Sequence, residues 1–106
     1  MLNIKNIIES IKAGRIRITD HADDEAQNDH LLFADILISV QRGEIIKQYP
    51  EDKPYPSCLI FGRNVKGEPV HSVWGYNADT EASVLITVYR PDSTIWMEDW
   101  KTRRKR

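Results

Sequence analysis

Three side chains in the sequence are candidates for proton transfer: the imidazoles of His21 and His71 and the phenol of Tyr89. A histidine gains or loses its charge in that range and so serves as a general acid or base. His21 stands where an expected strand meets an expected helix, and His71 lies in PVHSVWG on the strand face it shares with Val73. A structural role stays open for both, with His21 packing at the helix start and His71 held by a backbone group or carboxylate.

Metal-independent cleavage of an RNA phosphodiester also needs cations beside the phosphate. The candidates are Arg15, Arg17, Arg63, Arg90, Arg103 and Arg104. The chain has 106 residues and a net charge of −1, but its last six residues, KTRRKR, include five basic side chains and no acid. We therefore expect a single domain over residues 1–100 and a basic C-terminal tail over residues 101–106. The tail serves either as an arm for nucleic acid or as a solvated end.

Several well-known site motifs are missing from the sequence. It has no glycine-rich phosphate loop, no nucleophile elbow and no HExxH zinc helix. His21 and His30 are nine residues apart, which is not a ligand spacing on one helical face. The single cysteine, Cys58, lies in an apolar strand and is typical of a core residue. We expect no metal and no cofactor, a cytoplasmic location, and no membrane span because the apolar runs are short.

The first half of the chain predicts helices around one short strand. Residues 4–13 place isoleucines at helical spacing between Asn3, a plausible N-cap, and Gly14. RIRIT alternates as a half-buried strand does, and the polar residues 20–30 predict a solvent-facing helix capped by Asp20. Apolar residues four apart predict another helix ending at Gly43; they are Leu32, Ile36 and Val40.

From residue 44 the pattern changes to that of strands. EIIKQYP, SCLIFGR, PVHSVWGY and ASVLITVYRP are rich in β-forming residues and are separated by turn signals. Alternation in the last strand would set Val84, Ile86 and Val88 against Leu85, Thr87 and Tyr89. The C-terminal segment suggests a short helix with Trp96 and Trp100 on one side. The order predicts an α+β fold, with N-terminal helices packed on one face of an antiparallel sheet of about four to five strands.

As an ordered set, RIRITDHADDEA, DILISVQRGEIIKQYPEDKPYPSCLIFG, PVHSVWG and VLITVYRPD resemble a widespread bacterial family of domains of unknown function, over about residues 10–100. That family is similar to the RelE and BrnT toxins and to motility-regulator-type mRNA interferases of toxin–antitoxin systems. The resemblance implies a RelE-like fold and metal-independent mRNA cleavage on the sheet face. It places the recurrent polar positions at His21, His71 and Tyr89. It also implies a cognate antitoxin as partner, of zinc-finger type in some members.

The sequence departs from that family after His21, where DDEAQND carries no basic residue. Acidic side chains repel phosphate, which argues against this segment touching RNA. Three functional hypotheses follow. The first is an endoribonuclease of RelE type, with RNA or the ribosome as its target. The second is a non-catalytic module that pairs with a protein through an edge strand or the tail. The third is an RNA-binding domain that uses the tail and stacks bases on Trp96 and Trp100.

Overall fold

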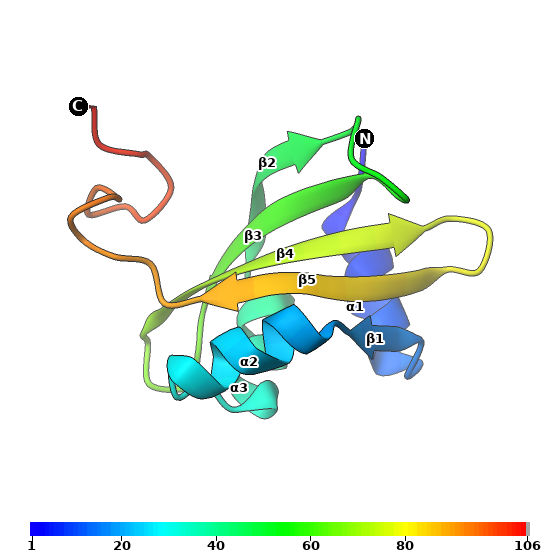
Figure 1. Ribbon diagram of the computed structural model, residues 1–106, viewed down its shortest axis with the longest axis horizontal. Coiled ribbons are helices and arrows are strands. Elements are labelled where there is room, and N and C mark those ends of the chain that lie inside the picture. The colour runs from blue at the N-terminus through cyan, green and yellow to red at the C-terminus, as the bar shows by residue number, and fades with distance from the viewer. Residues whose placement is uncertain (106) are drawn as a thin grey trace.

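The computed structural model describes residues 1–105. Its elements within that range are α1 (Ile4–Lys12), β1 (Ile16–Ile18), α2 (Asp20–Asn28), α3 (Phe33–Gln41), β2 (Glu44–Tyr49), β3 (Ser57–Arg63), β4 (Pro69–Asn77) and β5 (Ala82–Tyr89). The strands form one sheet in the order β1-β5-β4-β3-β2 (Figure 1). β1 pairs with β5 in parallel, and the other neighbours are antiparallel. The predicted α+β class is confirmed.

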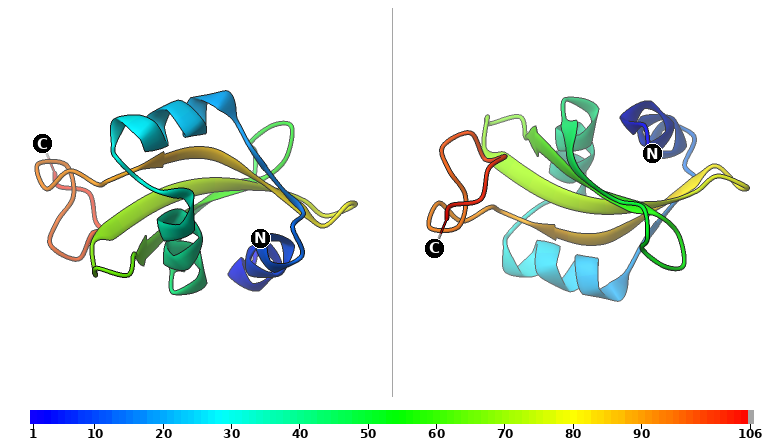
Figure 2. Two further views of the ribbon diagram at one scale, coloured as in Figure 1. Left: turned by 90° about the horizontal axis from the view of Figure 1, so that it is seen from below. Right: turned by 90° about the horizontal axis from the view of Figure 1, so that it is seen from above.

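Two of the helices, α1 and α3, cover one face of the sheet, as predicted (Figure 2). α1 begins after Asn3, whose side chain accepts the Lys5 N–H at 2.9 Å. It ends before Gly14, which has a φ of 74° that glycine adopts without steric cost. α3 lies so close to β3 that a Cβ on Gly62 would stand 1.7 Å from the Ser39 carbonyl oxygen. A glycine is therefore required at that contact.

α2 takes a different place from the other helices and lies alongside β5 (Figure 2). Its N-cap is Thr19, not Asp20 as predicted, because the Thr19 side chain accepts the Ala22 N–H at 3.1 Å. β1 is short and leaves the last part of the β5 edge unpaired. The Glu25 carboxylate satisfies one of the backbone groups on this unpaired edge by accepting the Val88 N–H at 3.2 Å. The acidic helix thus protects a sheet edge, and it is not simply solvent-facing.

The hydrophobic core lies between the sheet and the helices. Ile7 of α1, Ile36 of α3 and Trp74 of β4 are at most 1% exposed. α2 contributes the fully buried Ala22. β4 alternates as its sequence predicts. Trp74 lies on the face that points into this core, and His71 lies with Val73 on the face that points away from it. We call the sheet face opposite α1 and α3 the open face.

A register shift in β5 corrects the predicted alternation of its side chains. Val73 pairs with Thr87 and Trp74 pairs with Leu85, so Ile86 is an extra residue between the two pairs. A bulge of this kind shifts the alternation by one residue. Val88 therefore joins Leu85 in the core, although the pattern placed the two on opposite faces.

The C-terminal segment also differs from its prediction, because no helix is present between residues 90 and 105. The chain forms turns and folds back on itself. The Met97 N–H donates to the Thr102 carbonyl at 2.8 Å, and the Arg104 N–H donates to the Ile95 carbonyl at 2.8 Å. An isolated bridge joins Trp96 to Arg103. Residues 101–104 of the predicted tail are therefore tied to the segment before them. We call residues 91–105 the C-terminal loop.

None of the helices in residues 1–105 has both the length and the apolar character needed to cross a membrane.

Candidate functional site

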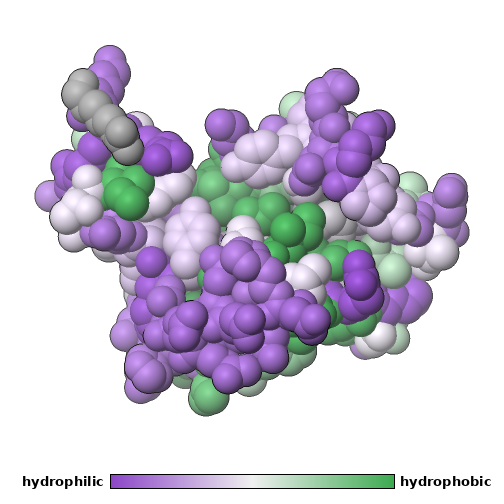
Figure 3. Space-filling view, in the orientation of Figure 1, coloured by the Kyte–Doolittle hydropathy of each residue, from purple (hydrophilic) through white to green (hydrophobic). Residues whose placement is uncertain are grey.

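The open face is hollowed, and its floor is apolar. Figure 3 looks onto this face and shows apolar side chains in a hollow bordered by polar ones. Across the strands, Phe61 pairs with His71, and His71 pairs with Tyr89, so that these aromatic rings form one row. The C-terminal loop lies at this end of the face (Figures 1 and 2).

His71 and Tyr89, two of the three predicted proton-transfer residues, are in direct contact. The Nδ1 atom of His71 lies 3.1 Å from the Tyr89 hydroxyl, and its Nε2 atom lies 2.7 Å from the Trp100 carbonyl oxygen. Trp96 packs edge-on against the imidazole, with 4.5 Å between the ring centroids. These neighbours leave His71 with 0% exposure.

The two partners of His71 define its tautomer. A carbonyl oxygen only accepts, so Nε2 carries the proton and donates it to Trp100. In the neutral ring Nδ1 is then an acceptor, and Tyr89 donates its hydroxyl proton to it. Burial lowers the pKa of His71, and the Trp100 carbonyl partly offsets this by favouring the charged form. His71 is therefore neutral at pH 7.

Tyr89 connects the buried imidazole to the open face. Burial raises the pKa of its phenol, and the nearby Tyr49 and Glu25 raise it further, while the Arg103 guanidinium lowers it. The same guanidinium also lowers the pKa of Tyr49, where burial is the larger effect and raises it. Arg103 thus lies close enough to both phenols to act on them electrostatically. Its Cζ is also 5.7 Å from the centre of the Trp96 ring.

His21 does not join the contact between His71 and Tyr89. It lies in the first turn of α2, its side chain is 70% exposed, and its Nε2 is 3.1 Å from the Glu25 carboxylate. The same carboxylate oxygen also accepts a hydrogen bond from the Thr87 hydroxyl. Thr87 is two residues before Tyr89 on β5, so Glu25 links His21 to the strand that carries Tyr89. A carboxylate in this position orients an imidazole.

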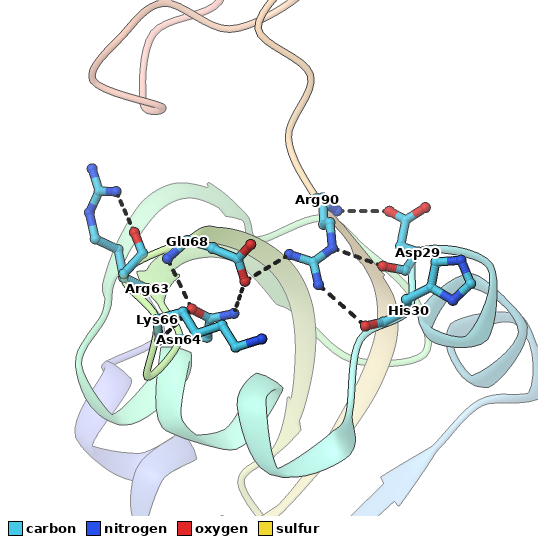
Figure 4. A network of polar contacts seen from close by, with 8 residues as sticks. Asp29, His30, Arg63, Asn64, Lys66, Glu68 and Arg90 are labelled. Carbon is cyan, nitrogen blue, oxygen red and sulfur yellow. Dashed lines mark hydrogen bonds and ion pairs between the residues drawn. The ribbon is translucent and has the colours of Figure 1, made fainter.

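Arg90 is held by groups from two separate parts of the chain (Figure 4). Its Nε donates to the Asp29 carbonyl at 2.8 Å, and one terminal nitrogen donates to the His30 carbonyl at 3.2 Å. The other terminal nitrogen is 3.4 Å from the Glu68 carboxylate. Glu68 is itself bonded to the Asn64 side chain at 2.8 Å. Arg90 therefore joins the end of α2 to the β3–β4 hairpin.

The other predicted arginines fall into two groups. Three of them donate to backbone carbonyls near the ends of strands or in the C-terminal loop: Arg15 to Glu81, Arg63 to Gly67 and Arg104 to Ser93. The remaining two lie by the open face. Arg17 lines a pocket with Val84 and Ile86, and the charge of Arg103 lowers the pKa values of the Tyr49 and Tyr89 phenols.

The structure adds residues to the site that sequence reasoning missed. Tyr49 and Glu25 lie near Tyr89, and the Trp100 carbonyl holds His71. The sequence pattern predicts only that Tyr49 belongs to a strand and that Glu25 belongs to a solvent-facing helix. The sequence signal for Glu25 is weak, because a polar helix with solvated carboxylates does not by itself indicate which of them contacts a strand. A backbone carbonyl carries no sequence signal.

Trp96 and Cys58 are both buried. Trp96 is 8% exposed and packs on His71, so its ring is not a free platform for a base. Cys58 is in the core, as predicted, and burial raises the pKa of its thiol to about 12. Within residues 1–105, no three side chains of His, Cys, Asp or Glu gather in a way that would hold a metal ion.

Comparison with known families assigns the chain to one of them. Residues 18–90 match the model of the DUF4258 family, which is described as a domain of unknown function. The match covers more than half of the chain, and the protein belongs to the DUF4258 family. His21, His71 and Tyr89 lie inside the matched range, whereas Trp96, Trp100 and Arg103 lie beyond it. No curated protein and no solved structure matches the chain.

Proposed function

We propose that this protein is the toxin of a toxin–antitoxin pair, a metal-independent endoribonuclease that binds RNA on its open face. The observation that carries the proposal is the hydrogen bond between Tyr89, which reaches the open face, and the buried neutral His71. The unprotonated Nδ1 of His71 can accept a proton, and because the imidazole is buried, a substrate on the open face can pass a proton to it only through the Tyr89 hydroxyl. The same reaction is what the sequence resemblance, to a family similar to RelE-type and BrnT-type toxins, implies.

The reaction is an attack by a ribose 2′-oxygen on the adjacent phosphorus. A bond forms between these atoms, the bond from phosphorus to the 5′-oxygen breaks, and the products are a 2′,3′-cyclic phosphate and a 5′-hydroxyl. The 2′-hydroxyl must lose a proton, the leaving 5′-oxygen must gain one, and the negative charge on phosphate must be stabilised.

Tyr89 and His71 act together as the base in this proposal. The Tyr89 oxygen receives the 2′-hydroxyl proton while its own proton moves to Nδ1 of His71. His71 becomes an imidazolium whose Nε2–H remains bonded to the Trp100 carbonyl, which favours the charged form. Tyr89 is the catalytic residue because it touches substrate. His71 acts through Tyr89 and is a positioning and proton-storing residue.

The other two roles fall to groups on the rim of the same face. Arg103 lies near Tyr89 and Tyr49, where its charge would stabilise the phosphate oxygens. His21 is the proposed acid for the leaving oxygen, because its imidazole is exposed and its other side is held by Glu25. Arg17 and Arg103 are the proposed RNA contacts among the arginines. The proposed protein partner is an antitoxin that covers this face.

The test combines growth with purified chemistry. The wild-type chain and the variants Tyr89→Phe, His71→Gln and His21→Ala are induced in a bacterial host and then purified for cleavage of bare RNA. Tyr76→Phe is the matched control, because Tyr76 lies on the core side of β4. We expect wild type and control to arrest growth and cleave RNA to cyclic-phosphate ends. Tyr89→Phe should cleave about 100-fold more slowly while still binding RNA.

A second function, a non-catalytic module that binds a protein partner, is favoured by the complete burial of His71. If His71 serves only to fasten the C-terminal loop through Trp100, replacing His71 will lower the stability of the fold and will not alter any rate of RNA cleavage. Normal growth with intact RNA for the wild-type chain, and no cleavage by the purified protein, would support this module and refute the nuclease.

A further inference from the structure

A pocket of about 240 Å³ lies on the open face beneath the β2–β3 loop. Its floor is formed by Gly75 of β4 and by Val84 and Ile86 of β5, and Pro54 and Tyr55 of the loop close it on another side. Gly75 has no side chain, and a Cβ added there would meet Ile86 at 3.3 Å. The floor is therefore flat where strands β4 and β5 meet.

The size and shape of the pocket fit one planar ring system. Pockets that take whole drug-sized ligands measure about 300–1,000 Å³, so this pocket is smaller than those. Tyr55 lines the pocket beside this apolar floor, and aromatic rings of this kind are the groups on which nucleobases stack in single-stranded RNA sites. Val84 pairs with Gly75, and ordinary alternation puts Ile86 on the same side. The bulge at Ile86 then brings Thr87 and Tyr89 onto this face as well, so the face is continuous from the pocket to Tyr89.

The polar groups of the pocket match a nucleotide. Arg17 and Lys53 line it and form no ion pair with another residue among residues 1–105. Both are available for a phosphate. Asp52 also lines it, and its carboxylate already accepts hydrogen bonds from the Ser57 hydroxyl at 2.7 Å and the Lys53 N–H at 3.0 Å. A carboxylate fixed in this way accepts from an exocyclic amine, a group that adenine, guanine and cytosine carry.

We infer that this pocket binds a single unstacked nucleobase of an RNA strand, with its phosphate on Arg17 and Lys53. The inference rests on the proposed function and adds to it the way the strand is held. Tyr55 stacks on the base, and the strand continues along the apolar floor toward Tyr89. A base with an exocyclic amine is preferred over uracil because Asp52 has no donor to offer.

The experiment measures binding in two ways. Tyr55→Ala removes the stacking ring, and Tyr55→Phe is the matched control because it keeps the ring. Each protein is titrated with a short single-stranded RNA and with RNAs that lack one base at successive positions, with fluorescence anisotropy as the readout. We expect loss of one particular base to weaken wild-type binding about tenfold. Tyr55→Ala should bind intact RNA about tenfold more weakly and be insensitive to that loss, and Tyr55→Phe should behave as wild type.

The second measurement uses mononucleotides and does not depend on binding a whole strand. Amide NMR shifts are followed while cytidine or adenosine monophosphate is added, with uridine monophosphate and inorganic phosphate as comparisons. We expect shifts at Gly75, Val84 and Ile86 with the first two nucleotides that vanish in Tyr55→Ala. RNA binding that no missing base weakens, with no shifts at these residues, would overturn the base pocket and leave the RNA-binding proposal standing. No RNA binding at all would overturn both.

Discussion

The variant Arg90→Ala tests whether the arginine directly after β5 fastens the fold or is available to bind RNA. The change Arg90→Ala removes two hydrogen bonds to the Asp29 and His30 carbonyls and one ion pair with Glu68. Each carbonyl bond is worth about 1 kcal/mol of net stability. The ion pair joins side chains that are 36% and 46% exposed, so solvent screening makes its contribution minor. We expect a loss of about 2 kcal/mol.

The assay is urea unfolding followed by circular dichroism, with melting as a second readout. A loss of this size lowers Tm by roughly 8 °C in a domain of about this length. Arg90→Lys should recover about half of the stability, because one ammonium group does not span both carbonyls. Glu68→Gln is the matched control. It removes the charge and keeps an oxygen for Asn64, so the midpoint of urea unfolding should hardly change.

The RNA affinity of the folded Arg90→Ala variant is measured alongside. We expect it to be unchanged, because the guanidinium is already engaged on three sides. A phosphate contact would behave differently, since its loss would weaken binding to every sequence and reduce the salt slope by about 1. Unchanged stability together with weakened RNA binding would refute the structural role derived for Arg90 and return it to the RNA-binding group.

Two further predictions concern stability. Gly62→Ala places a Cβ against the Ser39 carbonyl and should lower the free energy of unfolding by about 3 kcal/mol. Gly67→Ala has open space around it and should cost only about 1 kcal/mol, because of its positive φ. Urea unfolding measures both, and equal costs would contradict the close contact between α3 and β3. Burial lowers the pKa of His71 in the folded protein, so the His71 imidazole binds a proton more readily in the unfolded chain. The contribution of the neutral imidazole to stability is therefore complete above pH 6.5, the ordinary pKa of histidine, and is lost as the pH falls below that value. Unfolding from pH 7.5 to 5 should show a weaker pH dependence for His71→Gln than for wild type, and identical profiles would contradict this.

Much of the local structure was predictable because it depends on neighbours in sequence. The isoleucine spacing of residues 4–13 defined α1, with Asn3 and Gly14 at its ends as expected. Ile36 and Val40 of the apolar spacing before Gly43 lie in α3 and are buried, whereas Leu32 precedes the helix as its N-cap and is 70% exposed. The alternating, turn-separated segments after residue 44 defined the strands and, with them, the α+β class. Capping, periodicity and turn chemistry act over a few residues, so the sequence carries them directly.

The residue types of the candidate site could be recognised in the sequence, but which of these side chains contact one another could not. His71 and Tyr89 were selected for their chemistry, and alternation alone would have placed Tyr89 with Leu85. The bulge at Ile86 reverses this and brings Tyr89 opposite His71. A bulge depends on how two strands pair across the sheet, which is a long-range property.

Only the tertiary structure decided which candidates are free and which are engaged. Burial of His71 follows from a loop that returns from residue 100, and Arg90 is held by carbonyls 60 and 61 residues away in sequence. The acidic α2 covers the β5 edge because β1 is too short to do so. The sequence determined which elements form and which side chains have suitable chemistry. Packing determined their exposure and partners, because both depend on residues that are distant along the chain.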